Sequence, residues 1–81
     1  MQERGIKMKE LELKLNELEE ELKNVDGTML NIKVEIEHCK KLKLDYLSYE
    51  MIYNKCNESK KEIERKINII NNAMDILEGI E

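Results

Sequence analysis

The strongest constraint on the fold is a heptad repeat in the first half of the chain, where ten successive core positions are apolar. Their spacing alternates between three and four residues, which gathers them into one stripe along an α-helix. Such a stripe must pack against another helix. These ten positions, which we call the first seam, are Met8, Leu15, Leu22, Met29 and Ile36 at heptad position a, and Leu11, Leu18, Val25, Ile32 and Cys39 at position d.

Composition supports an all-α fold in a single small domain covering residues 1–81. Charged residues make up 40% of the chain, and proline, tryptophan and phenylalanine are absent. This composition is typical of long solvated helices rather than of sheets. Because 81 residues bury only a modest core, oligomerisation is the expected source of further stability.

Two segments are candidate breaks between helices. Asp26-Gly27 is a turn dipeptide and Thr28 can cap a following helix, so we predict a turn near 24–28. The heptad phase nevertheless runs through this segment, with Gly27 at an outward position. A second turn is possible near 57–59, where Ser59 and Glu62 have the form of a capping box but no Gly or Pro supports a break. The chain therefore contains two or three long helices.

A second seam follows the first with a change of phase. The step from Ile36 to Cys39 to Leu42 is three residues and then three, so a continuous helix would turn its buried face at this point. The second seam consists of Cys39, Leu42, Tyr46, Tyr49, Tyr53, Cys56, Lys60, Ile63, Ile67, Ile70, Met74 and Leu77.

Further apolar stripes lie outside both seams. One consists of Ile69, Ala73, Ile76 and Ile80, and another of Leu44, Leu47 and Met51. A helix with more than one apolar face is typical of a bundle with several neighbours. Leucine at a with valine or isoleucine at d also favours more than two strands. We therefore predict a coiled-coil hairpin that assembles into a homo-oligomeric helical bundle, a tetramer rather than a dimer.

The chain's three aromatic residues fall in its only basic stretch. Residues 40–66 carry a net charge of +3, whereas 1–39 carry −4 and 67–81 carry −3. Tyrosine rings can stack on a base while basic side chains hold phosphates. This pattern indicates a candidate ligand site made of Lys43, Tyr46, Tyr49, Tyr53, Asn57, Lys60, Lys61, Arg65 and Asn68.

A plainer interpretation of the same residues stays open. Tyrosines at helical spacing are usually seam residues that pack against a neighbouring helix. In that interpretation Lys61, Arg65 and Asn68 belong to a solvated outer face.

Several other functions find little support in the sequence. It contains no Gly-rich phosphate loop and no nucleophile elbow, so we expect no enzymatic activity and no cofactor. Glu35 and His38 are too short a pattern to predict a metal site. The basic run Lys40-Lys41-x-Lys43 is thin for binding a DNA duplex.

The expected location is the cytoplasm. No stretch approaches the roughly 20 apolar residues of a membrane span, and the first residues do not resemble a signal peptide. Cys39 and Cys56 both fall on a seam, which is typical of reduced thiols inside a core.

Two functional hypotheses follow. The first is a non-enzymatic oligomeric protein that sequesters a small anionic aromatic, nucleotide-like ligand between its helices. Lysine outnumbers arginine 12 to 2, typical of AT-rich genomes, and a concrete form of this hypothesis is a phage-encoded sponge for a nucleotide immune signal. The alternative is a coiled-coil protein–protein interaction module: an adaptor, an assembly factor or an inhibitor of a host protein.

Overall fold

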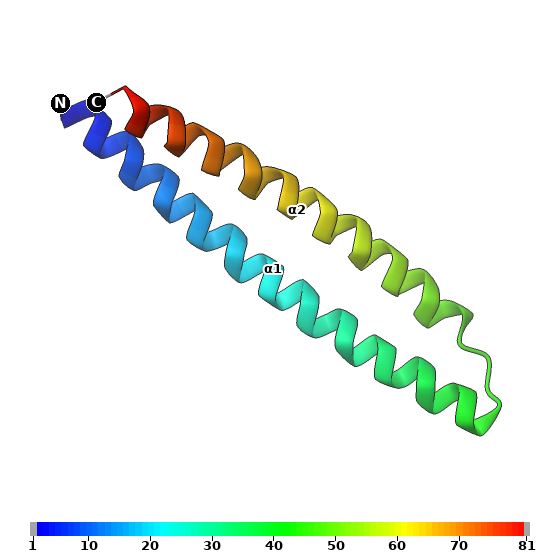
Figure 1. Cartoon of the computed structure of the whole chain (residues 1–81). Coiled ribbons are helices and arrows are strands. Elements are labelled where there is room, and N and C mark those ends of the chain that lie inside the picture. Colours follow the sequence, from blue (N-terminus) through cyan, green and yellow to red (C-terminus); the bar gives the residue numbers. More distant parts are fainter. Residues whose placement is uncertain (1, 81) are drawn as a thin grey trace.

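The chain forms an antiparallel hairpin of two long helices (Figure 1). The computed structural model describes residues 2–80, with side chains from residue 5 onward. Helix α1 spans Gln2–Leu42 and helix α2 spans Leu47–Gly79, with 41 and 33 residues respectively. The molecule is a rod measuring 62 × 14 × 13 Å. The prediction of an all-α hairpin is confirmed, with two helices rather than three in the described part of the chain.

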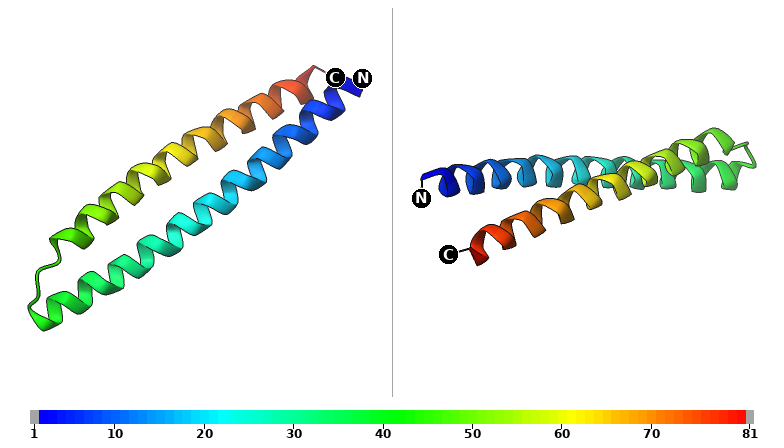
Figure 2. Two further views of the ribbon diagram at one scale, coloured as in Figure 1. Left: turned by 180° about the vertical axis from the view of Figure 1, so that it is seen from behind. Right: turned by 90° about the horizontal axis from the view of Figure 1, so that it is seen from above.

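The two helices pack side by side at an angle to each other. Seen from behind they run side by side, and seen from above they cross (Figure 2). Their packing follows the first seam, since all ten of its positions are buried or half-buried. At the centre of the core, Leu18 of α1 packs with Ile63 and Ile70 of α2.

The predicted turn near 24–28 is wrong, because α1 continues through it. Val25 and Met29 are held against α2 on either side of Gly27, so a break there would disrupt the seam. Gly27 faces open space, and a glycine inside a helix costs only about 1 kcal/mol. The Thr28 hydroxyl donates a hydrogen bond of 3.0 Å to the Asn24 carbonyl oxygen, so it bonds to the preceding turn of α1 instead of capping a new helix.

The possible turn near 57–59 is also wrong, because α2 runs unbroken from Leu47 to Gly79. Ser59 is exposed in the middle of this helix and does not cap it. The polar seam residue Lys60 is instead accommodated by an ion pair with α1, described below.

The chain reverses at residues 43–46, where neither glycine nor proline is present. Lys43 adopts a left-handed backbone with φ of 58°. The amide of Leu44 donates to the carbonyl of Cys39 at 2.9 Å, and the amide of Lys43 donates to that of Lys40 at 3.2 Å. These two bonds form a Schellman motif that closes α1.

Asp45 stabilises the start of the second helix from two residues before it. Its Oδ1 accepts a hydrogen bond of 3.0 Å from the amide of Leu47, the first residue of α2. This bond satisfies one of the amides left free at a helix start. The phase change seen in the sequence therefore marks the end of a helix and not a rotated face. The prediction that Leu42 is a seam residue is therefore wrong, because its side chain is exposed.

The core is thin. Among the described side chains, only Leu18, Met29, Ile32, Cys39, Ile63 and Ile70 are buried. Neither described helix is both long enough and apolar enough to cross a membrane.

Candidate functional site

The antiparallel register gives the hairpin two open sides. Positions e and g flank a coiled-coil seam on opposite sides, and in an antiparallel pair e positions meet e positions and g positions meet g positions. If Tyr46, Tyr53 and Lys60 are placed at a in α2, one side carries only polar residues. This polar face is formed by Glu12, Glu19, Asp26, Lys33 and Lys40 of α1 and by Glu50, Asn57, Glu64, Asn71 and Glu78 of α2.

A groove of about 380 Å³ lies on the polar face near the chain reversal. The tip of the hairpin positions it, because the capped turn places Tyr46 directly before α2. We call it the tyrosine groove. It is lined by Lys33, Ile36, Glu37 and Lys40 of α1 and by Tyr46, Glu50, Tyr53 and Asn54 of α2.

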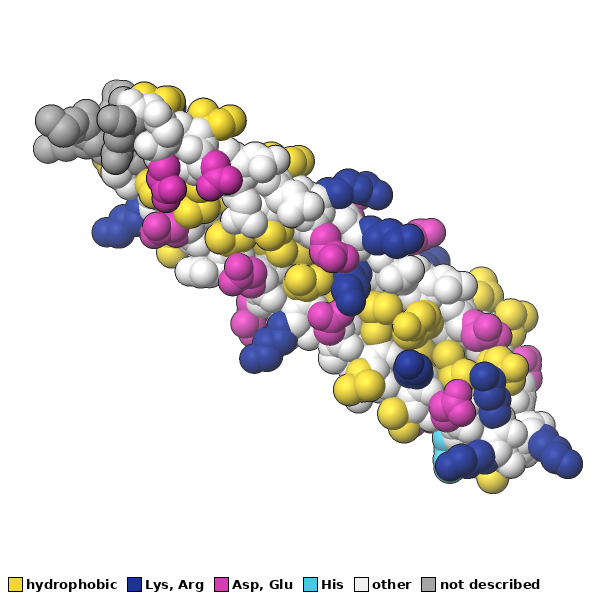
Figure 3. All heavy atoms as spheres, viewed as in Figure 1, with side chains coloured by type: hydrophobic (Ala, Val, Ile, Leu, Met, Phe, Trp, Pro, Cys, Tyr) yellow, Lys and Arg dark blue, Asp and Glu magenta, His cyan; other side chains and the backbone are white. Residues whose placement is uncertain are grey.

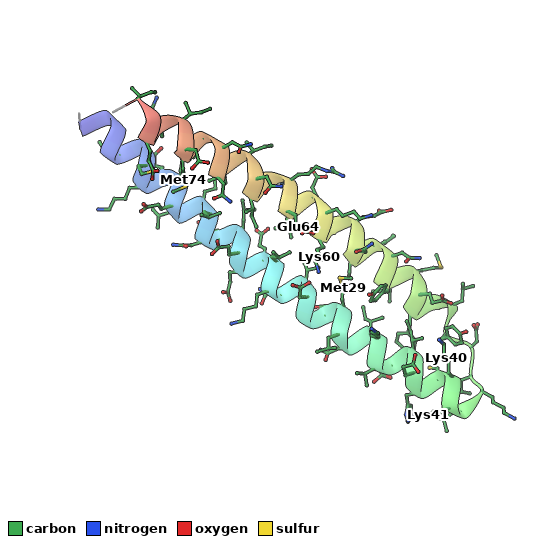
Figure 4. All side chains as sticks on the ribbon, in the orientation of Figure 1. Met29, Lys40, Lys41, Lys60, Glu64 and Met74 are labelled. Carbon is green, nitrogen blue, oxygen red and sulfur yellow. The ribbon has the colours of Figure 1, made fainter. Side chains whose placement is uncertain are left out.

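Lys40 organises one end of the tyrosine groove. Its Nζ lies 5.4 Å from the centroid of the Tyr46 ring, which is a cation–π distance. The same Nζ lies 3.6 Å from Oε1 of Glu37, one turn earlier on α1. Lys40 projects from α1 beside the loop in Figure 4. The groove thus joins an aromatic ring and an exposed cation, while Glu37 and Glu50 balance the charge of its two lysines.

Lys60 is held by the opposite helix. Its Nζ lies 2.8 Å from Oδ1 of Asp26, and the side chain extends between the two helices (Figure 4). The hydrogen bond to the Asp26 carboxylate, together with its charge, raises the pKa of Lys60 above the ordinary lysine value. This is the only ion pair between the helices in the described part of the chain, and it lies where the seam lacks an apolar side chain.

The nine sequence-predicted site residues do not gather at one place. Tyr46 and Tyr53 line the tyrosine groove, whereas Tyr49 and Asn57 are half-buried outside it and Lys43 is exposed in the turn. Lys60 is bound to Asp26. The remaining three, Lys61, Arg65 and Asn68, are exposed on α2.

Arg65 is paired within its own helix. Its Nη1 lies 2.9 Å from Oε2 of Glu62, one turn earlier. The stripe formed by Lys61, Arg65 and Asn68 lies farther along α2 than the tyrosine groove. It therefore does not line the groove within one chain. The plainer interpretation, a solvated outer face, describes its position in the hairpin.

The sequence interpretation missed the residues that α1 gives to the groove. Lys33, Ile36, Glu37 and Lys40 come from the other helix, so finding them requires the antiparallel register. The signal was the phase change at Cys39: a reversal directly after it brings Lys40 beside Tyr46.

The other open side combines polar residues of α1 with a row of isoleucines on α2, and we call it the apolar face after Ile69, Ile76 and Ile80. A second hollow of about 490 Å³ lies there, between Lys14, Glu17, Leu18 and Glu21 of α1 and Lys66, Ile69 and Ile70 of α2. Ile69 is 66% exposed at its edge. Hydrophobic side chains also reach the surface elsewhere on the rod, including the outer edge of α2 (Figure 3).

A comparison with protein families, with curated protein sequences and with solved structures gives no significant match to this chain. Functional assignment therefore rests on the hairpin and its two faces.

Proposed function

We propose that the chain is a non-enzymatic coiled-coil interaction module whose hairpin assembles with copies of itself into a helical bundle. The observation that carries this proposal is the large apolar surface of the single hairpin. Twelve large hydrophobic side chains in the described part of the chain are 48–66% exposed, twice as many as the six that are buried. Apolar exposure of this extent favours association.

The amount of exposed surface supports the same proposal. The hairpin exposes 6704 Å², whereas a compact monomer of 9.7 kDa exposes about 5,100 Å². A specific protein–protein interface buries about 800 Å² on each partner. The excess of about 1,600 Å² is therefore large enough for more than one such interface.

The number of chains follows from the number of helices. The hydrophobic side chains left exposed on the two-helix rod favour an assembly of more than two helices. Since each chain supplies two helices, two copies are enough to bring more than two helices together. A tetramer of chains would hold eight helices.

Sedimentation equilibrium of the purified chain tests this proposal. The expected mass is a multiple of 9.7 kDa, with two chains as the smallest assembly. A single-chain mass at high micromolar concentration, together with cooperative unfolding, would overturn it.

A second candidate function is favoured by the tyrosine groove. Tyr46 and Tyr53 line it together with Lys33 and Lys40, which is the combination of ring and cation that a nucleotide-like anion requires. In this candidate the assembled bundle sequesters such a ligand, as a phage-encoded sponge for a nucleotide immune signal would. The negative charges of Glu37 and Glu50, which also line the groove, repel an anion. We therefore place this function second.

Isothermal titration calorimetry with a panel of nucleoside triphosphates, cyclic dinucleotides and ADP-ribose tests the second candidate. Tyr53→Leu should abolish the binding heat, because Tyr53 lines the groove. Tyr49→Leu is the matched control: Tyr49 lies on the same seam of α2 but outside the groove, so binding should persist. Absence of heat with every compound, or equal loss in both variants, would contradict this candidate.

A further inference from the structure

We infer that a second copy of this chain docks on the apolar face through an antiparallel contact between the two α2 helices, centred near Ala73. This inference deepens the proposed self-association, on which it rests, by naming the face, the helix and the direction of pairing.

The location follows from the difference between the two faces of α2. On the polar face the positions beside the seam are Glu50, Asn57, Glu64, Asn71 and Glu78. On the apolar face the corresponding positions are Ile52, Ser59, Lys66, Ala73 and Ile80. Ile69 and Ile76 border the latter row, and both are 66% exposed. Ile69, Ala73, Ile76 and Ile80 form an uninterrupted stripe, which we call the isoleucine stripe.

The three isoleucines of the isoleucine stripe are exposed within their own chain, and only Ala73 is half-buried. The α1 side chains that line the nearby hollow are mainly charged, namely Lys14, Glu17 and Glu21. Because these charged side chains of α1 extend into water, they do not provide the exposed isoleucines of α2 with apolar neighbours. A matching isoleucine stripe on a second copy supplies one, and a two-fold axis makes the same patch serve both copies.

Ala73 allows the two helices to approach closely. It is the smallest side chain of the stripe and lies between Ile69 and Ile76. The distance between packed helices is set by the side chains at the contact, so an alanine there permits the short end of the usual 8–10 Å range, about 8 Å. In an antiparallel pair, Ile69 of each copy then packs beside Ile76 of its partner.

Charge selects the antiparallel direction. The last turn of α2 carries no basic residue, and Asp75 and Glu78 add negative charge to the negative end of the helix dipole. Lys66 lies at the opposite end of the stripe and lines the hollow on the same face. Antiparallel pairing brings Lys66 of each copy to the uncompensated end of the partner's α2. Parallel pairing would place the two Lys66 side chains together, which is unfavourable.

Cysteine cross-linking of the full chain tests the geometry. Ala73→Cys should form a disulfide-linked dimer under mild oxidation, because Cα atoms facing each other across the two-fold axis fall within the roughly 4.4–6.8 Å that a disulfide spans. The matched control is Asn71→Cys, two residues away, exposed and on the polar face. The unaltered chain, with Cys39 buried and Cys56 half-buried, gives the background. Failure of Ala73→Cys to link, or equal linking in both variants, would overturn the inference.

A charge substitution tests the same face without a covalent bond. The double variant Ile69→Lys/Ile76→Lys should sediment as a single chain with unchanged helical circular dichroism, since both side chains are exposed in the hairpin. Asn68→Lys/Asn71→Lys, which adds the same two positive charges at exposed positions outside the stripe, should keep the mass of the unaltered protein. An unaltered chain that sediments as a monomer would overturn self-association itself. A multimer that survives Ile69→Lys/Ile76→Lys would overturn only this docking face.

Discussion

The polar and apolar faces flank the same seam but offer different interactions. The polar face carries the Lys60–Asp26 ion pair and the tyrosine groove, so its contacts are directional. The apolar face carries the isoleucine stripe, whose contacts are non-directional and favour a further helix. The polar face therefore contributes contacts within the hairpin, whereas the apolar face leaves one side of the rod on which a further helix can pack.

The largest expected effect comes from the seam that both faces share. Leu18→Ala should lower the free energy of unfolding by about 2–4 kcal/mol, because it opens a cavity between Ile63 and Ile70. Glu19→Ala, at the next position on the polar face, should change it by less than about 0.5 kcal/mol. Urea unfolding followed by circular dichroism measures both. Equal effects would mean that the seam is not what holds the helices together.

The apolar face should make stability depend on concentration. For a fold completed by dimerisation, each tenfold rise in protein concentration adds up to about 1.4 kcal/mol of stability. The melting temperature of the unaltered chain should therefore rise with concentration, while that of Ile69→Lys/Ile76→Lys should not. Thermal unfolding over a hundredfold concentration range measures this. If the melting temperature of the unaltered chain does not change with concentration, the apolar face does not mediate association.

The outer surface of α1, which belongs to neither face, provides a third test. Gly27→Ala should stabilise the chain by about 0.5–1 kcal/mol, because alanine favours the helix and nothing lies within 4 Å of the added methyl group. Urea unfolding at one fixed concentration is sufficient. Destabilisation would indicate a bend at Asp26-Gly27 and a different alignment of both faces.

The smallest expected effect concerns the ion pair on the polar face. Because the pKa of Lys60 is raised in the folded state, its contribution is complete below the unfolded value of 10.5 and is lost as pH rises through the higher folded pKa. The unaltered chain should therefore lose more stability than Asp26→Asn when the pH is raised through this range. Urea unfolding of both proteins at neutral and alkaline pH gives the difference. Parallel losses would mean that the Asp26 charge does not contribute.

The hairpin could be predicted from the seam, but the place of its turn could not. Gly27 looks like a break and lies inside a helix, whereas Lys43 looks like a helix former and adopts a left-handed backbone. Buried packing decided both outcomes. The seam continues on both sides of Gly27, while beyond Cys39 it can continue only if the chain reverses. Local turn propensity, worth about 1 kcal/mol, is outweighed by several buried side chains.

The candidate site was predictable only in part for a related reason. Tyr46 and Tyr53 could be found because they repeat along one helix. Lys33 and Lys40 could not, since their place beside the tyrosines depends on pairing α1 with α2 in one register. Lys60 illustrates the same limit: its sequence context indicates a ligand contact, whereas in the hairpin its charge is engaged by Asp26 of the other helix.

The position of the two ends of the rod has a mechanical consequence. Residues near the start of α1 and the end of α2 lie together at one end of a 62 Å rod, with the Lys43–Tyr46 turn at the other (Figure 1). If the shared end is attached to a label or a surface, the turn lies at nearly the full length of the molecule from that attachment point. The hairpin can therefore act as a molecular ruler, and fluorophores placed at its shared end and at the turn would report whether it stays straight when a partner binds.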